Sequence, residues 1–113
     1  MVILTISVTV QSNKRNELLS ACRMITDQTR KKKGYLSCRL SQDIDNENVI
    51  NIEETWDRRS HLDDHFRSDI FSALLGSVKL LCETHEIRIN DGSQTEGLEA
   101  VQMARSKEGM SDQ

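Results

Sequence analysis

The sequence predicts an α+β protein in which two helices cover one face of an antiparallel sheet. Three observations support this fold class. Apolar residues recur with a period of two in four segments, they recur with a helical period in two others, and these segments follow one another as strand, helix, strand, strand, helix, strand. That βαββαβ order is the ferredoxin-like arrangement, a two-layer sandwich.

The four predicted strands alternate apolar and polar side chains. The first spans residues 2–10 and has its apolar face at the even-numbered positions. Residues 35–44 and 49–56 flank a polar turn and should pair as a hairpin, and the last strand spans 82–91. In the three later strands, the face predicted to meet the helices carries Leu36, Cys38, Leu40, Ile50, Ile52, Glu54, Trp56, His85, Ile87 and Ile89.

The two predicted helices are amphipathic. The first begins at Ser12 and is stopped by Gly34. The lysine triplet at 31–33 favours the negative pole of this helix, and we prefer that interpretation to a phosphate site because no glycine-rich loop precedes a helix start. Asp57 is the expected N-cap of the second helix, and the polar residues 67–69 predict a break in it. The buried stripe of the first helix is Leu18, Cys22, Ile25 and Thr29.

Charge and composition exclude several function classes. The 113 residues carry a net charge of -3 and the pI is near 5.6, whereas nucleic-acid binders usually show a basic excess. No apolar run approaches the roughly 18 residues of a membrane span, and the N-terminus lacks the basic start of a signal peptide. The three cysteines form no Cys-x-x-Cys pair, which favours buried thiols over disulfides. We therefore expect a cytoplasmic protein with no nucleic-acid or membrane partner.

The sheet face that points away from the helices is unusually polar. Such a face is either solvated or packed against the same face of a second copy through ion pairs and hydroxyl groups. We favour the homodimer, because a chain with a small core gains most from pairing. The polar residues predicted on this face are Thr5, Ser7, Thr9, Ser37, Arg39, Asn51, Glu53, Thr84, Glu86 and Arg88.

The chain divides into a folded domain at residues 1–92 and a polar tail at 93–113. The tail has no aromatic residue. Its first four residues fit a capping box, and a weak apolar stripe follows them. We expect a short helix that docks on the body or on a partner subunit, with disorder from about Ser106.

The segment that begins at Glu54 concentrates the residues that could carry chemistry. Glu54 and Trp56 share the strand face that meets the helices, where a carboxylate can act as a general base or as a hydrogen-bond anchor. A tryptophan at a strand end is also an ordinary core residue. His65 lies about 60° from Leu62 on a helical wheel, so it borders the core either as a packing histidine or as a proton shuttle in a pocket wall.

His61 and His65 are four residues apart, a spacing that a metal pair can have. No third ligand follows at a suitable spacing, although Asp57 or Asp64 could be proposed, and we expect no metal site. His61 lies further from the apolar stripe and should be solvated. The sequence also has no nucleotide-binding loop, haem-attachment motif or catalytic triad signature.

The same segment resembles the signature of the antibiotic biosynthesis monooxygenase (ABM) family. That signature is Glu-x-Trp, a short spacer, Ala-Leu-x-x-His, and a Ser/Thr step into a helix with an aromatic residue. The similar stretch here is Glu54-x-Trp56, four residues, then His61-Leu62-x-x-His65-x-x-Ser68-x-x-Phe71. Upstream, Gly34-Tyr35-Leu36-Ser37-Cys38 is similar to the family's Gly-Cys-x-x-Tyr step, with tyrosine and cysteine exchanged. The resemblance covers roughly residues 2–91.

The resemblance implies a dimeric α/β barrel of two ferredoxin-like subunits, each with a pocket between sheet and helices. It further implies a cofactor-independent monooxygenase that oxidises a small aromatic or quinol-like substrate with molecular oxygen. We accordingly expect no cofactor. Glu54 and His65 are the candidate catalytic residues, as base or donor, and the candidate substrate-binding residues are Trp56, Phe66, Phe71 and Tyr35.

Two other functions are compatible with the same fold. Haem-degrading relatives carry an asparagine in the first strand and an iron-ligating histidine on the second helix. The first strand here has no asparagine and Ser-Ala-Leu-Leu-Gly-Ser follows Phe71, so we do not expect haem degradation. The alternative hypothesis is a non-catalytic dimeric module that binds or senses a small ligand. An open pocket around Glu54 and His65 would favour the enzyme, and a filled interior would favour the module.

Overall fold

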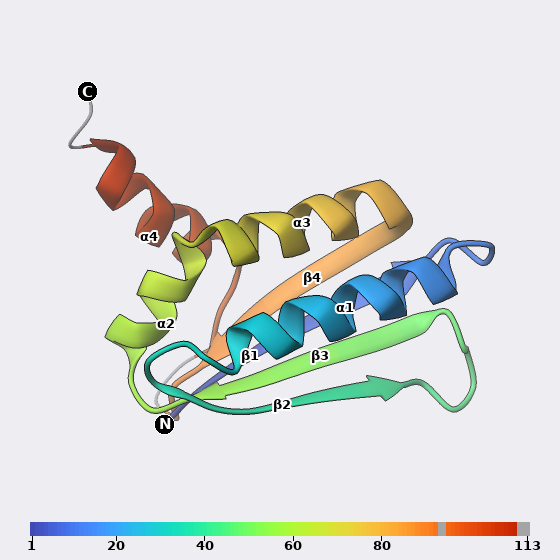
Figure 1. The fold of residues 1–113 in the computed structure, drawn as a ribbon, viewed down its shortest axis with the longest axis horizontal. Coiled ribbons are helices and arrows are strands. Elements are labelled where there is room, and N and C mark those ends of the chain that lie inside the picture. Colours follow the sequence, from blue (N-terminus) through green and yellow to red (C-terminus); the bar gives the residue numbers. More distant parts are fainter. Residues whose placement is uncertain (93–94, 111–113) are drawn as a thin grey trace.

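The computed structural model describes residues 1–92 and 95–110. Its sheet has the strand order β2-β3-β1-β4-β5, and every neighbouring pair is antiparallel (Figure 1). This is the predicted α+β ferredoxin-like arrangement, extended at one edge by a two-residue strand. The strands are β1 (Val2–Val10), β2 (Tyr35–Gln42), β3 (Val49–Trp56), β4 (Cys82–Asn90) and β5 (Thr95–Glu96).

The helices all lie on one face of the sheet. Figure 1 shows α1 and α3 side by side along the strands, with α2 and α4 at the end where β3 finishes. The opposite face carries no helix in the part of the chain that the structure describes. The helices are α1 (Arg15–Thr29), α2 (Arg59–Phe66), α3 (Asp69–Leu81) and α4 (Leu98–Met110).

The core lies between the sheet and these helices, and strand alternation selects its residues. In β1 every even-numbered residue from Val2 to Val10 is buried, as the sequence predicts. In β3 the alternate residues from Ile50 to Trp56 are buried in the same way. The register pairs Trp56 with Val2, which places the end of β3 beside the beginning of β1.

Strand β2 departs from its predicted alternation. Leu36, expected on the helix-facing side, is 52% exposed. The pairing with β3 shifts between Tyr35 and Ser37, as in a β-bulge: Tyr35 pairs with Trp56, whereas Ser37 pairs with Thr55. A bulge inserts one residue and reverses the side-chain alternation across it. The prediction for Leu36 is therefore wrong, and the bulge brings Tyr35 next to Trp56. The strand also ends at Gln42, before the predicted residue 44.

The helix boundaries differ from the sequence predictions at three points. Helix α1 begins at Arg15 and ends at Thr29, so the lysine triplet lies in the turn beyond it. Asp57 is not an N-cap, because the N-cap position of α2 is Arg58 and has no side-chain capping bond. The predicted break is confirmed: Ser68 caps α3, and its hydroxyl accepts a hydrogen bond from the Phe71 N–H.

Helix α4 packs against the body through one apolar stripe. Ala100, Val101 and Ala104 are buried, and the Arg67 guanidinium donates a hydrogen bond to the Ala104 carbonyl at 3.1 Å. The predicted capping box includes Ser93, which lies outside the described residues. Glu96, its other member, forms an ion pair with Arg59. The helix continues past residue 106 to Met110.

All three cysteines are free thiols. Burial raises the pKa of Cys22 to about 11, and it also raises the pKa values of Cys38 and Cys82. These thiols are therefore protonated at neutral pH and pack as small apolar groups. Within residues 1–92 and 95–110, no helix combines the length and the hydropathy that crossing a membrane would need.

Candidate functional site

Glu54 and Trp56 occupy the inner face of β3 at its end. Their spacing of two residues puts both side chains on the helix side of the sheet. Glu54 is 2% exposed and Trp56 is fully buried. The Trp56 indole donates a hydrogen bond from Nε1 to Glu54 Oε1 at 3.0 Å. A carboxylate this deeply buried needs such donors, because transfer of its charge out of water is costly.

His65 approaches the same carboxylate from helix α2. Its ring stacks on Trp56 with a centroid distance of 4.8 Å and an interplanar angle of 30°. The His65 Nε2 atom lies 3.4 Å from Glu54 Oε1, within ion-pair range. Neither ring nitrogen of His65 makes a hydrogen bond to any described residue, although the side chain is buried. The imidazole is thus held by stacking on Trp56 beside Glu54, and its hydrogen-bonding capacity is unused among the described residues.

The remaining aromatic candidates extend this cluster on both sides. Phe71 packs edge-on against His65 at 5.3 Å between centroids, and Phe66 packs against Phe71 at 5.0 Å. Tyr35 meets Trp56 edge-on at 6.0 Å. The structure therefore brings all six residues predicted from the sequence into one continuous set of contacts. We call this set the inner cluster: Tyr35, Glu54, Trp56, His65, Phe66 and Phe71.

Tyr35 provides the one hydroxyl group of the inner cluster. Desolvation raises its pKa above the usual value, and a hydrogen bond from Arg30 partly offsets that rise. The phenol consequently stays protonated at neutral pH. It can act as a hydrogen-bond donor rather than as a base.

The interior of the inner cluster is filled by its own side chains. Trp56, Phe66 and Phe71 are all fully buried. From outside, a recess of about 180 Å³ reaches His65, and the other residues that line it are Lys32, Lys33, His61 and Asp64. This recess therefore borders the inner cluster at His65.

His61, predicted to be solvated, is largely covered. Its side chain is 15% exposed, and its Nδ1 lies 2.7 Å from Asp57 Oδ1. The hydrogen bond with His61 lowers the pKa of Asp57. The backbone of Gly34 lies directly on this pair, which is why the expectation for His61 is wrong. The i,i+4 spacing of Asp57 and His61 in the sequence was the signal that could have identified the pair.

Gly34 is needed for this close approach. Its φ is +91°, in the left-handed region that favours glycine. A Cβ there would lie 2.4 Å from His61 Nδ1 and 2.6 Å from Asp57 Oδ1. The Asp57 N–H donates to the Gly34 carbonyl at 2.9 Å, which fixes the turn in place. The sequence pattern around Gly34 predicts a helix stop and a family-like step, but it does not reveal this packing against Asp57 and His61.

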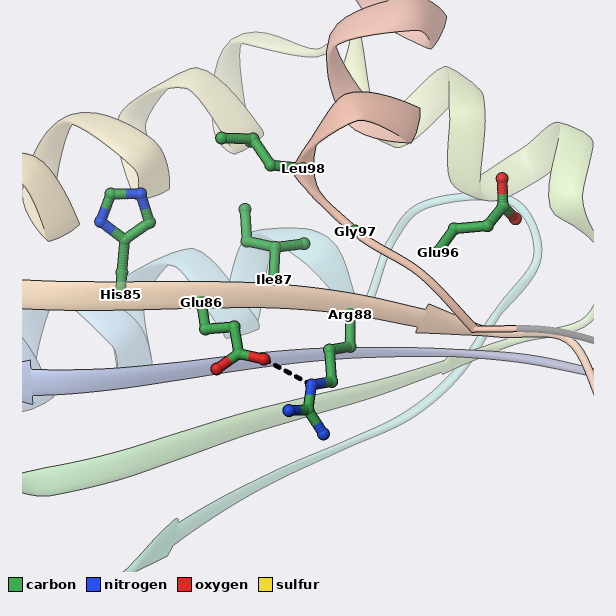
Figure 2. A pocket seen from close by; sticks show the side chains of 7 residues that line it. All are labelled: His85, Glu86, Ile87, Arg88, Glu96, Gly97 and Leu98. Atoms are coloured by element: carbon green, nitrogen blue, oxygen red, sulfur yellow. Dashed lines mark hydrogen bonds and ion pairs between the residues drawn. The ribbon is translucent and has the colours of Figure 1, made fainter.

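A larger recess of about 420 Å³ lies elsewhere, between β4 and the β5–α4 junction. Figure 2 shows His85, Ile87 and Leu98 on the helix side of β4, with Glu86 and Arg88 on the other side of the strand. These walls are mostly exposed, and the cavity contains none of the inner cluster. The predicted chemistry therefore does not belong to this larger recess.

No group of three or more metal-ligating side chains comes together among residues 1–92 and 95–110. His61 and His65, the pair with metal-like spacing, have different neighbours: His61 pairs with Asp57 and His65 with Glu54. The two imidazoles thus serve separate contacts within the fold.

The fold and the inner cluster together define an α+β protein with a carboxylate, an imidazole and an indole buried beneath the helices. The model of the family "Antibiotic biosynthesis monooxygenase" (ABM) matches residues 1–75, and the chain belongs to that family. The match includes every residue of the inner cluster.

Several crystal structures share this fold at low sequence identity. A conserved protein from Methanosarcina mazei Go1 is 23% identical, with a TM-score of 0.75 over 79% of this chain and 89% of that one. An antibiotic biosynthesis monooxygenase is 18% identical, with a TM-score of 0.74 over 83% of this chain and 100% of that one. A variant of SnoaB, a cofactor-independent oxygenase from Streptomyces nogalater, is 16% identical, with a TM-score of 0.74 over 82% and 93%. No curated protein matches the chain.

Proposed function

We propose that this protein is a cofactor-independent monooxygenase that oxidises a small aromatic or quinol-like substrate with molecular oxygen. The observation that carries the proposal is the buried contact of Glu54, Trp56 and His65, in which one carboxylate oxygen faces both an indole N–H and an imidazole nitrogen. Membership of the ABM family supports it. The fold likeness to a cofactor-independent oxygenase agrees with it.

The proposed reaction takes its electrons from the substrate. A base removes a proton from an activated carbon or from a hydroxyl group conjugated with it, and the resulting anion reduces oxygen. Carbon–oxygen bond formation gives a hydroperoxide, which loses water to leave a carbonyl group. For an activated CH₂ group the balance is R₂CH₂ + O₂ → R₂CO + H₂O, so one oxygen atom enters the product. The protein has to supply a base, a donor for the developing oxyanion and a site that excludes water.

The inner cluster contains groups suited to these tasks. Glu54 or His65 would take the proton, and their 3.4 Å separation lets one pass it to the other. The Tyr35 hydroxyl is the donor that the inner cluster can offer to an oxyanion, because the single Trp56 N–H is already donated to Glu54. Phe66 and Phe71 would keep the surroundings apolar. A planar substrate would enter by displacing aromatic side chains, because these fill the interior.

We also propose that the active form is a homodimer that pairs through the open sheet face. That face carries hydroxyl, amide and charged groups that can pair across two copies. On it the Ser7 hydroxyl donates to Asn51 Oδ1 at 2.6 Å, and Arg88 forms an ion pair with Glu86. Pairing would cover this face of the sheet and leave the helix layer of each copy outside.

The second candidate function is a non-catalytic module that binds a small ligand. The observation in its favour is the filled interior, since Trp56, Phe66 and Phe71 are fully buried. A module of this kind would retain the fold and the recess at His65, and it would consume no oxygen.

Oxygen uptake separates the two functions. We expect chelator-treated protein to consume oxygen with at least one member of a panel of quinols and hydroxylated polycyclic aromatics. Glu54→Gln should lower kcat by roughly 100-fold or more, the usual contribution of a general base. Glu17→Gln is the matched control, because Glu17 is exposed on α1 and pairs only with Lys14 among the described residues. Full activity in Glu54→Gln would remove Glu54 as the base, and no uptake across the panel would favour the binding module.

A further inference from the structure

We propose that the recess at the α1–β2 turn binds an acidic group of the ligand, so that the substrate is an aromatic or quinol-like acid. We call this the lysine recess; its lining residues are Lys32, Lys33, His61, Asp64 and His65. The inference names the substrate class of the proposed enzyme and in that respect rests on the proposed function. Its test measures binding and requires no turnover.

The charge of the lysine recess is unbalanced. Asp64 is neutralised by Arg67, and Asp57, behind the recess, is hydrogen-bonded to His61. Lys32 and Lys33 take part in no ion pair within the described part of the chain. Two lysines therefore line one recess without an ion-pair partner among the described residues. A carboxylate or another oxyanion is the chemistry that two such groups recognise.

His65, one of the residues that line the recess, has hydrogen-bonding capacity that the described residues do not use. His65 is 2% exposed, and both its ring nitrogens lack a hydrogen-bond partner among the described residues. A buried polar atom without a partner is unfavourable, so a ligand or water that hydrogen-bonds to the His65 ring would remove this penalty. This observation is independent of the lysines and points to a ligand or ordered water at His65.

The turn that presents the lysines is held in a defined position. Gly34 follows Lys33 directly and packs against the Asp57–His61 pair. The contact is so close that a Cβ at this position would clash with both side chains. The Asp57 N–H bonds to the Gly34 carbonyl at 2.9 Å, and the Lys32 N–H bonds to the Thr29 carbonyl at 2.9 Å. Figure 1 shows this turn next to α2. The lysine backbone is thus preorganised against α2 rather than free in solvent.

The size of the recess indicates which part of a ligand it takes. Its volume is about 180 Å³, whereas sites for whole drug-sized ligands are about 300–1,000 Å³. It accommodates an acidic head group, and the aromatic part of the ligand would extend beyond it past His65. Because His65 lines the recess and stacks on Trp56, a ligand bound here would lie next to the inner cluster.

Calorimetric titration with two matched compounds tests the proposal. 2,5-Dihydroxybenzoate and hydroquinone differ only in the carboxylate, and work under nitrogen prevents their oxidation. We expect the acid to bind the wild-type protein about tenfold or more tightly than hydroquinone, as a charge-assisted contact supplies. The double variant Lys32→Gln/Lys33→Gln should lose this preference. Lys31→Gln, an exposed neighbour that does not line the recess, should retain it.

NMR of the histidine side chains, recorded on the same samples, shows where the acid binds. The chain has three histidines, of which His61 and His65 line the recess and His85 lies on β4. The ring signals of His61 and His65 should shift with 2,5-dihydroxybenzoate, and those of His85 should not. Equal affinity for the two compounds, no binding of the acid, or an unchanged preference in the double variant would overturn the proposal. Binding of the acid without any oxygen uptake would instead count against the monooxygenase alone.

Discussion

At the scale of single residues, Gly34 is the position where the backbone most restricts the sequence. Gly34→Ala should destabilise the fold by roughly 1–4 kcal/mol, because the new Cβ combines a strained φ with a close contact on His61. Gly76→Ala is the matched control: Gly76 lies inside α3 with nothing within 4 Å of a Cβ, so alanine should stabilise the protein by about 0.5–1 kcal/mol. Urea unfolding measures both, and equal effects of the two variants would contradict this account of the turn.

The Asp57–His61 hydrogen bond predicts a dependence of stability on pH. This bond lowers the pKa of Asp57 in the folded state. Its contribution to the free energy of unfolding is therefore fully present above the usual aspartate pKa of about 3.9. That contribution is lost as the pH falls through the lowered pKa of the folded state. Asp57→Asn should therefore be less stable than the wild type at pH 5, and the difference should shrink at about pH 2.5. Urea unfolding at the two pH values checks this, and a difference that does not change with pH would exclude the linkage.

Strand alternation was enough to predict the inner-cluster residues of β3, because a half-buried strand fixes which side chains share a face. It placed Glu54 and Trp56 together beneath the helices, where they are found. It could not predict the position of Tyr35, since that depends on a bulge opposite Thr55 that no local residue pattern signals. The recess at His65 was missed for a similar reason: it forms only when the turn at Gly34 packs on α2.

At the level of helices and strands, the packing of α4 against the body can be tested by mutation. Val101 is 1% exposed, and the Arg105 guanidinium bonds to the Phe66 carbonyl and, at 2.9 Å, to the Ser72 hydroxyl. Val101→Asp would bury an unpaired charge, so α4 should detach while the sheet stays folded. Hydrogen exchange should then speed up in α4 but not in β1.

Gln102→Asp provides the control for this experiment. It introduces the same charge one residue away, at an exposed position of α4. Its exchange rates should match those of the wild type. Unchanged protection of α4 in Val101→Asp would mean that this helix does not depend on its buried stripe.

The order of the elements was predictable because each has a strong local signal. The helix break was visible as a polar run, and Ser68 caps α3 where that run predicts a restart. The start of α2 was less predictable, because Asp57 fits the N-cap pattern but bonds to His61 instead. Helix ends depend on such competition between local partners, which a sequence pattern does not resolve.

At the scale of the whole molecule, the polar sheet face predicts a homodimer. Arg88→Glu should shift the protein toward the monomer in sedimentation equilibrium, because it places two carboxylates side by side where Arg88 now pairs with Glu86. Lys79→Glu reverses the same charge on the exposed side of α3 and should leave the dimer intact. A dimer that persists in Arg88→Glu would exclude this face as the interface.

Incubation under ¹⁸O₂ tests whether the inner cluster supports oxygenation without a cofactor. Chelator-treated protein and a substrate that gives oxygen uptake are incubated under ¹⁸O₂, and the product is analysed by mass spectrometry. We expect one ¹⁸O atom in each product molecule, with the second leaving as water. We also expect a large loss of labelled product in Glu54→Gln. Product without label, or labelled product that forms equally well without the protein, would contradict the claim.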